Sequence, residues 1–296
     1  MFWKKNGNKI LLVNGGSKKF GLDFLHYTAQ NNLDCRKIRT YVNSAIVLDK
    51  NKIDFYESGE FLNLSDYKYA FIRVKTMGSQ LTSIFCEILN DLKINYNDKS
   101  NIEHTMGDEK ITQMVRFAIN KIPIPKTMIF SDKSFQKNIE VFRKNFTFPC
   151  VMKTNGSKGR AVWKITSEDQ IAKIIEDTKK EIYMVQEYIP NQYDVRVVVA
   201  FGKIVGAIER HSSDGFYNNV AMGGVTKVAN LSAKEKKLSL AVCKIMKLEL
   251  GGVDFVRVAD GIKFFEVNKG PVVYGFQDAT RINVPEVLVK NIKKII

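Results

Sequence analysis

Two acidic residues and an amide within residues 251–283 are the side chains of this sequence best suited to hold a metal ion. Asp254 lies in a segment of alternating apolar residues, and Glu266 and Asn268 lie in a second such segment. The residues between the two segments, Ala259-Asp260-Gly261, are typical of a turn, so a β-hairpin is expected. Two carboxylates and an amide oxygen on one face of a hairpin are hard oxygen ligands that Mg2+ uses, with phosphates and water completing its shell.

The expected register of the hairpin brings these three side chains together. With a three-residue turn, Val258 lies opposite Ile262, and counting back along both strands places Asp254 opposite Glu266. Asn268 follows two residues later on the same face, because side chains alternate along a strand, at cross-strand distances of roughly 5 to 8 Å.

A simpler alternative is a surface hairpin whose acidic residues are solvated. Phe264 and Phe265 directly precede Glu266, however, and a run of two aromatic residues is more typical of a buried segment. The sequence therefore favours a metal site.

A basic residue followed by glycines forms a candidate phosphate site. Lys153 ends a predicted strand and is followed by the segment 155–160, in which Ser157 lies between Gly156 and Gly159. Glycines allow the close backbone approach that a phosphate-binding loop requires. Taken alone, this segment is explained more simply as an ordinary loop between two strands.

The segment 185–190 is a predicted strand that runs into a turn. Its backbone suits pairing with an adenine ring, with Glu187 binding an amine or a ribose hydroxyl; the alternative is a strand end with a solvated glutamate. Asp194 and Arg196, on one face of the next strand, equally fit a structural ion pair. The polar loop 211–224 is longer than a tight turn, and loops of this length are usually functional or mobile.

Composition places the chain among cytoplasmic globular proteins without a membrane partner. It has 296 residues, of which 45% are hydrophobic and 26% charged, and no apolar run reaches the roughly 18 residues of a membrane span. Its 4 cysteines are widely spaced and are expected to be reduced thiols. The net charge of +15 fits an acidic substrate or a bound polyphosphate, whereas lysines scattered along the whole chain argue against a dedicated nucleic-acid surface.

The first part of the chain predicts a parallel α/β domain. A strand at 9–16, an amphipathic helix and a strand at 35–39 form a β-α-β unit. The turn Gly15-Gly16-Ser17-Lys18 matches neither a dinucleotide fingerprint nor a P-loop. Arg73 ends a further strand, and such residues are more often solvated than functional, although strand ends of this kind are where ligands bind. A polar linker at 97–105 is expected to close this domain, residues 1–104.

The rest of the chain predicts two α/β lobes, residues 105–184 and 185–296. Ser167 with Gln170, and Ser232 with Glu235, have the spacing of capping boxes that open helices. The second of these helices is expected to run to about Leu250 and to end at Gly251.

Taken together, the lysine with its glycine loop, the EYIP segment, the polar loop with Gly-Gly and the Asp…Glu-x-Asn pattern resemble the ATP-grasp superfamily. Within it, the segment EVNKGPVVYGFQDATRINV resembles the RimK-like carboxylate–amine ligases, and the resemblance runs from about Met106 to the C-terminus. It implies an ATP-grasp fold of the α/β class (α+β lobes), with the first domain resembling, in organisation only, the Rossmann-like domain that precedes it.

The resemblance also implies roles for individual residues. ATP would be bound by Lys110, Lys153, Gly156, Ser157, Gly159, Gln186, Glu187, Tyr188, Ile189, Asp194 and Asn219. Mg2+, or Mn2+ in its place, would be bound by Asp254, Glu266 and Asn268. In such ligases a carboxylate attacks the γ-phosphate of ATP to give an acyl phosphate and ADP, and an amine then displaces phosphate to leave an amide.

The sequence departs from the glutamate-adding members near the acceptor. Phe216-Tyr217-Asn218-Asn219 replaces their F-R-S-N, Met222 replaces an arginine, Lys269-Gly270 replaces a pair of small residues, and Arg281 replaces a glycine. Specificity for glutamate is therefore in doubt, and Arg210, Lys269 and Arg281 are candidates for holding a substrate carboxylate. Lys153 and Arg210 are the catalytic candidates.

The leading hypothesis is an ATP-dependent ligase that joins an amino acid, or a peptide or protein carboxylate, to an amine. The alternative is a nucleotide-binding regulator or peptide binder of the same fold without turnover, for which two carboxylates facing ATP have little use. Homo-oligomerisation is left open by the sequence.

Overall fold

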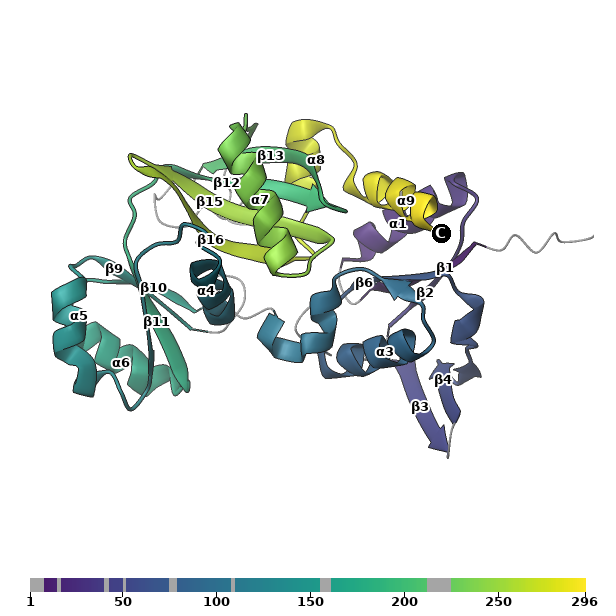
Figure 1. The fold of residues 1–296 in the computed structure, drawn as a ribbon, viewed down its shortest axis with the longest axis horizontal. Helices are drawn as coiled ribbons and strands as arrows, with labels where there is room; N and C mark the ends of the chain where they lie inside the picture. Colours follow the sequence, from purple (N-terminus) through teal and green to yellow (C-terminus); the bar gives the residue numbers. More distant parts are fainter. Residues whose placement is uncertain are drawn as a thin grey trace, which may run out of the picture.

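The computed structural model describes residues 8–14, 17–39, 43–49, 52–74, 79–107, 110–154, 161–211 and 225–296. They form four sheets with helices packed against them (Figure 1). No helix in these ranges is long and apolar enough to cross a membrane.

The first sheet is parallel, with the order β2-β1-β6-β7, as the β-α-β pattern predicts. Its elements are β1 (Lys9–Asn14), α1 (Lys18–Gln30), β2 (Asp34–Ile38), β6 (Tyr69–Arg73), α3 (Ser79–Asp91) and β7 (Asn95–Tyr96). A small antiparallel sheet projects from it (Figure 1) and consists of β3 (Ser44–Asp49), β4 (Lys52–Glu57) and β5 (Glu60–Phe61), followed by the 3-10 turn η1 (Leu64–Asp66).

The segment expected to be a polar linker is instead buried and helical. It forms η2 (Lys99–Gly107), and Asn97 and Asp98 before it are almost fully buried. The Asn97 amide bonds the backbone of Ile72, while the Asp98 carboxylate accepts the backbone N–H groups of Glu249 and Leu250 at 2.7 and 3.0 Å. These polar side chains serve as backbone hydrogen-bond partners, which explains how they tolerate burial.

The second sheet is antiparallel, with the order β10-β9-β11-β8, and two helices cover one of its faces (Figure 1). Thr166 and Gln170 replace the capping box expected at Ser167, because the Gln170 side chain accepts the Thr166 N–H and Ser167 makes no side-chain cap. This part comprises α4 (Lys110–Ile119), β8 (Thr127–Ser131), η3 (Gln136–Asn138), α5 (Ile139–Asn145), β9 (Cys150–Thr154), β10 (Val162–Ile165), α6 (Glu168–Thr178) and β11 (Ile182–Glu187).

The third sheet is antiparallel, with the order β14-β13-β12-β15-β16, and α7 lies across one face (Figure 1). The capping box of Ser232 and Glu235 is confirmed at the start of α7. Gly251 does not end this helix; it lies in β15, where an added Cβ would be 2.5 Å from the Cys243 sulfur. The elements are β12 (Tyr193–Ala200), β13 (Lys203–His211), β14 (Val225–Val228), α7 (Ala233–Ile245), β15 (Leu250–Val258), β16 (Gly261–Lys269), α8 (Tyr274–Thr280) and α9 (Val284–Ile295).

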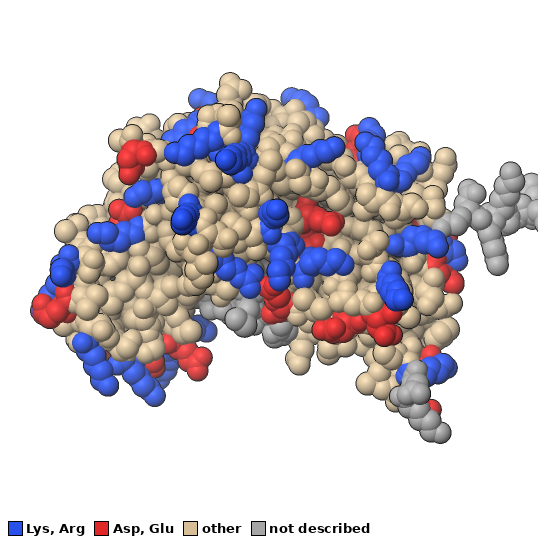
Figure 2. All heavy atoms as spheres, in the orientation of Figure 1, with Lys and Arg blue, Asp and Glu red and all other residues tan. Residues whose placement is uncertain are grey.

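The end of the chain returns to its beginning. Helix α9 packs on α1 (Figure 1), and Leu288 and Ile292 share one core with Phe20 and Phe24. The hydrophobic core beside the first parallel sheet therefore includes C-terminal residues. The visible surface carries Lys and Arg interspersed with Asp and Glu (Figure 2), and the basic residues are spread over many elements.

Candidate active site

The hairpin β15–β16 carries Asp254 and Glu266 directly opposite each other, as predicted, but by a different register. Its turn has two residues rather than three, so Val258 pairs with Gly261 and the expected pairing with Ile262 is wrong. A bulge lies between the pair Phe255–Phe264 and the pair Asp254–Glu266, which leaves Phe265 unpaired.

The bulge also changes which face each side chain occupies. Phe264 and Val267 both enter the buried core, where the rings of Phe264 and Phe255 lie 5.3 Å apart. Phe265, Glu266 and Asn268 are partly exposed and lie on the other face. In a regular strand Phe264 and Glu266 would share a face, so the extra residue places the carboxylate in the site.

Asn268 joins the two carboxylates. Its Nδ2 donates to Asp254 Oδ2 at 3.2 Å and to Glu266 Oε1 at 2.9 Å. Lys110 Nζ, at the start of α4, lies 2.6 Å from Glu266 Oε2. Burial favours the protonated form of Glu266, but Lys110 and Asn268 outweigh it and hold the pKa of this carboxyl well below its usual range.

Two arginines compensate the aspartates of the same face. Arg196 donates two hydrogen bonds to Asp254, at 2.7 and 2.6 Å, and Arg210 donates two to Asp194, both at 2.6 Å. Arg210 also lies 3.1 Å from Asp254 Oδ2. The ion pairs therefore run across strands and no pair joins Asp194 to Arg196. Burial raises the pKa of Asp194 to about 6, although Arg210 opposes this shift.

Lys153 reaches this cluster from the second sheet. Its Nζ donates to Gln186 Oε1 at 2.6 Å and lies 5.2 Å from the centre of the Phe265 ring. Burial, together with the charge of Lys110, lowers the pKa of Lys153 to about 8. The cluster thus contains cations from α4, β9, β12 and β13 and carboxylates from β12, β15 and β16.

The segment predicted to bind adenine lies at the end of β11. Gln186 is buried and its Nε2 donates to the Thr127 hydroxyl at 2.9 Å. The carboxylate of Glu187 accepts the Lys126 backbone N–H at 2.8 Å and Lys263 Nζ at 2.5 Å, and these bonds hold its pKa below the usual range despite burial.

Other predicted site residues have varied positions. Tyr188 and Ile189 follow Glu187 and are partly buried, with Lys164 Nζ 4.4 Å from the centre of the Tyr188 ring. Lys269 ends β16 near Asp98 and Cys86; burial raises the pKa of both groups, and the charge of Lys269 partly opposes these shifts. Arg281 is exposed at the end of α8 and makes no ion pair or side-chain hydrogen bond with a described residue. Gly156, Ser157, Gly159 and Asn219 lie outside the described residues.

Two residues of the site were missed from the sequence. Arg196 was assigned only to a pair with Asp194, although its position opposite Asp254 in the neighbouring strand makes it the main partner of that carboxylate. Gln113 was not considered; its amide donates to the Val267 carbonyl and accepts the Val267 N–H, at 3.1 and 2.9 Å, between Glu266 and Asn268. The spacing of Lys110 and Gln113, three residues apart on one helix, is the signal that could have revealed it.

The donor set fits Mg2+. Asp254, Glu266 and Asn268 supply two carboxylates and an amide in mutual contact, and internal cations now neutralise those carboxylates. Within the described ranges no group of three or more His, Cys, Asp or Glu is arranged to hold a metal ion alone, so a metal here needs further oxygens from a phosphate or water.

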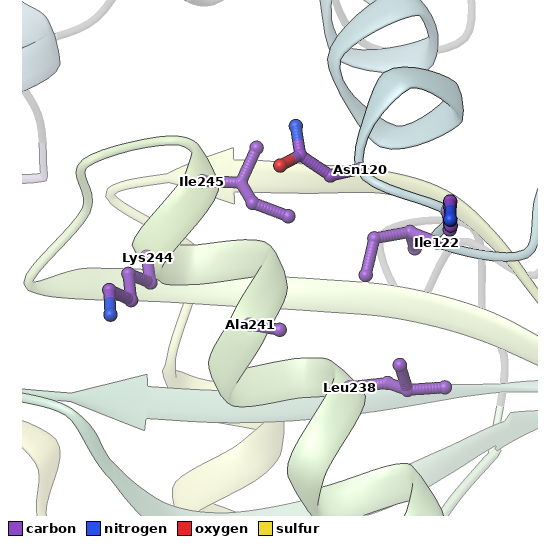
Figure 3. A pocket seen from close by; sticks show the side chains of 7 residues that line it. Asn120, Ile122, Leu238, Ala241, Lys244 and Ile245 are labelled. Carbon is purple, nitrogen blue, oxygen red and sulfur yellow. The ribbon is translucent and has the colours of Figure 1, made fainter.

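A groove of about 490 Å3 lies elsewhere, between the end of α4 and α7 (Figure 3). None of the residues of the charged cluster lines it. Its lining residues are Asn120, Lys121, Ile122, Leu238, Ala241, Lys244 and Ile245.

Solved structures of similar fold support this placement of the elements. The macrocyclase MdnB from Microcystis aeruginosa MRC has a TM-score of 0.72 at 12% identity, covering 96% of this chain and 98% of that one. The ATP-grasp ligase PsnB, complexed with minimal precursor, Mg and ADP, has a TM-score of 0.69 at 13% identity, covering 99% of this chain and 98% of that one. The chain therefore has the ATP-grasp fold.

Sequence comparison gives the family. A protein of Shewanella pealeana (strain ATCC 700345 / ANG-SQ1) named as a probable alpha-L-glutamate ligase is 29% identical over 247 residues, which are 81% of this chain and 52% of that protein. The chain thus spans about half the length of this relative. The family described as the RimK-like ATP-grasp domain matches residues 107–292. The chain belongs to the family of RimK-like ATP-grasp domains.

Proposed function

We propose that this protein is an ATP-dependent ligase that joins a carboxylate to an amine. The observation that carries the proposal is the contact of Asp254, Glu266 and Asn268 beside Lys110 and Lys153. Two carboxylates and an amide would hold a metal ion that neutralises phosphate charge, and the two lysines suit the phosphates themselves. The names of the glutamate-ligase and macrocyclase relatives support the same class of reaction.

In this proposal the nucleotide lies between the second and third sheets. The segment 186–189 holds the adenine, Lys110 and Lys153 contact the phosphates, and Asp194 lies near the nucleotide edge. The glycine segment 155–160 and Asn219 complete the phosphate site.

The three oxygen-bearing residues would hold Mg2+, or Mn2+ in its place, which when bound neutralises charge on the phosphates during transfer. The carboxylate substrate attacks the γ-phosphate, giving an acyl phosphate and ADP. An amine then attacks the acyl carbon, phosphate leaves, and an amide remains. Lys153 stabilises the negative charge of the phosphates through its ammonium group, which its partly buried position strengthens.

The proposed substrate is an amino acid or a peptide carboxylate, and the net charge of +15 favours an acidic one. Of the described cations, Arg210 lies in the cluster and is the proposed catalytic arginine, while Lys269 and Arg281 remain proposed substrate contacts. The proposed division into residues 1–104, 105–184 and 185–296 assigns the nucleotide to the last two parts. Four free cysteines support a cytoplasmic location.

A screen of amino acids for ADP release, with mass spectrometry of the products, tests the proposal. We expect ADP release that requires both a carboxylate and an amine, an amide of matching mass, and loss of both in Asp254→Ala and Glu266→Ala. ADP formation without any amide product, under every combination of substrates, would count against ligase activity.

A further inference from the structure

Arg73 is a buried arginine at the carboxyl end of a central strand of the N-terminal parallel sheet. It is the last residue of β6 and pairs in register with Asn14, the last residue of β1. Only 7% of Arg73 is exposed. The carboxyl ends of adjacent parallel strands are where open α/β sheets bind their ligands.

The contacts of Arg73 leave its charge without a counterion. Its Nη2 donates to the carbonyls of Gly270 and Pro271, at 3.3 and 3.0 Å, and its guanidinium carbon lies 4.1 Å from the centre of the Phe20 ring. Its Nε is buried without a hydrogen-bond partner. Among the described residues no carboxylate forms an ion pair with it; Asp23, nearby in sequence to Phe20, instead accepts the hydroxyl of Tyr274.

Other buried or partly buried arginines of this protein have the carboxylate partner that Arg73 lacks among the described residues. Arg210, buried to a similar degree, is bonded to Asp194 and lies beside Asp254. The partly buried Arg116 and Arg257 each pair with glutamate. Burial without such a partner lowers the pKa of Arg73 to about 10. A buried charge that is left unpaired is strongly unfavourable, so a position of this kind is suited to an anionic ligand.

The position of Arg73 connects it with the proposed metal site. Gly270 and Pro271, which accept its hydrogen bonds, follow Asn268 by two and three residues. A Cβ added to Gly252 would lie 2.7 Å from the Pro271 Cβ, and Gly252 is the residue opposite Asn268. Arg73 is thus separated from the carboxylate cluster by a single packed loop.

We propose that Arg73 binds a carboxylate of the substrate that does not react, such as the α-carboxylate of an amino acid. This inference rests on the proposed ligase function. A guanidinium binds a carboxylate through two parallel hydrogen bonds, which lowers the nucleophilicity of its oxygens. The carboxylate that attacks ATP therefore lies beside the proposed metal ligands. Arg73 selects substrates that carry a second carboxylate at the correct distance from the reacting one.

The test compares Arg73→Met and Arg73→Lys with the matched control Arg36→Met. Arg36 lies on β2 of the same sheet, is partly exposed, and forms an ion pair with Glu60. Each protein is assayed for ADP release with the amino acid found by the screen and with its α-carboxamide, and for MgATP affinity by calorimetry. Thermal unfolding is recorded in parallel.

We expect Arg73→Met to raise the KM of the amino acid by about tenfold or more, because a charge-assisted hydrogen bond is lost. The preference for the amino acid over its α-carboxamide should also be abolished. Affinity for MgATP stays unchanged, Arg73→Lys recovers part of the preference, and Arg36→Met behaves as wild type. If Arg73→Met keeps the preference for the amino acid over its α-carboxamide, the inference is overturned, whatever the thermal unfolding shows. A lower unfolding temperature with that preference kept would mean that Arg73 has a purely structural role. An equal loss of MgATP affinity would overturn it in favour of a phosphate contact.

A binding experiment separates failure of this inference from failure of the proposed function. If no compound supports ADP release, thermal stabilisation by L-glutamate and by its α-carboxamide is measured for wild type and Arg73→Met. If glutamate but not its α-carboxamide stabilises wild type, and this stabilisation is absent in Arg73→Met, the proposed carboxylate site is supported even though the ligase proposal fails. Equal responses of wild type and Arg73→Met would contradict the carboxylate site.

Discussion

Asp254 lies directly opposite Glu266 because a bulge at Phe265 offsets the two-residue turn of the hairpin. The same bulge sends Phe264 to the core and leaves Phe265 and Glu266 side by side on the other face. Phe265 thereby provides an apolar neighbour for Lys153, and Glu266 provides a partner for Lys110. One inserted residue thus places both an acid and an aromatic ring in the proposed nucleotide site.

Lys153 predicts a pH dependence of ATP binding. Its pKa, lowered to about 8, means that the ammonium group is lost as the pH rises through 8, and with it a phosphate contact. We expect ATP affinity to fall between pH 7 and pH 9 in a titration with a fluorescent ATP analogue. Lys153→Met should bind ATP weakly and with no such fall, whereas Lys173→Met, an exposed lysine of α6, should match wild type.

The stability of the protein should show the opposite trend. The unfolded chain keeps Lys153 protonated up to about pH 10.5, so between pH 8 and 10.5 the unfolded state binds more protons and stability attributable to Lys153 rises with pH. Denaturation of wild type and Lys153→Met over this window measures the difference. A difference in the free energy of unfolding that does not change with pH would contradict the buried-cation account.

Because Asp194 and Arg210 form a buried ion pair, we expect mutations of these two residues to have strongly non-additive effects on the free energy of unfolding. Arg210→Met leaves the buried Asp194 without its partner and is expected to lower the free energy of unfolding by about 3–5 kcal/mol. The double variant Asp194→Asn/Arg210→Met removes both charges and should recover most of that loss in urea denaturation. If Arg210 also acts in catalysis, activity stays low in the double variant. Additive losses of stability in the two single variants would show that the pair is not coupled.

The buried carboxyl of Asp98 is expected to make the free energy of unfolding fall as the pH rises from about 4 to 7. Burial raises the pKa of this carboxyl from 3.8 to about 7, against the two backbone N–H groups that favour its ionised form. The folded state therefore binds more protons than the unfolded state in this window, and the stabilisation present at low pH is lost as the pH passes 7. A shift of one pKa unit corresponds to about 1.4 kcal/mol, so the effect reaches about 4 kcal/mol at most.

Asp98→Asn retains an oxygen that can accept both N–H groups and cannot ionise. Urea denaturation at a series of pH values should show a smaller fall in stability for Asp98→Asn than for wild type. Asp132→Asn, at an exposed position, is the control and should follow the wild-type curve. Identical pH dependence in Asp98→Asn and wild type would mean that Asp98 is ionised throughout.

Local patterns predicted much of this molecule. The parallel β-α-β opening, the capping box at Ser232 and the grouping of Asp254, Glu266 and Asn268 depend on residues close in sequence or on strand alternation. The first follows from apolar periodicity and turn residues, and the capping box follows from a spacing of three residues.

Tertiary contacts decided what the sequence could not. The polar segment at Asn97 and Asp98 reads as a linker, because its backbone partners, Ile72 and Glu249, lie far away in the chain. Gly251 resembles a helix end, but its position was determined by packing against Cys243. The bulge at Phe265 had one visible signal, the aromatic pair before Glu266, because strict alternation would place Phe264 on the same face as Glu266.

Arg281 shows how a departure from the family pattern is accommodated. It adopts φ of 62° at the end of α8, a left-handed conformation that favours glycine. This geometry is one that glycine adopts without steric cost, which fits the glycine of the ligase pattern that the sequence resembles at this position. The same residue remains a proposed substrate contact.

The central claim is that Asp254, Glu266 and Asn268 bind Mg2+ between the protein and ATP, and calorimetry of ATP binding with and without Mg2+ tests it most directly. We predict that Mg2+ strengthens ATP binding in wild type and in Asp260→Asn, a control at the turn of the same hairpin. In Glu266→Gln and Asp254→Asn this strengthening should vanish, while metal-free ATP binds at least as well as in wild type because a negative charge near the phosphates has gone. Full Mg2+ dependence of ATP binding in Glu266→Gln and Asp254→Asn would contradict the assignment of this site.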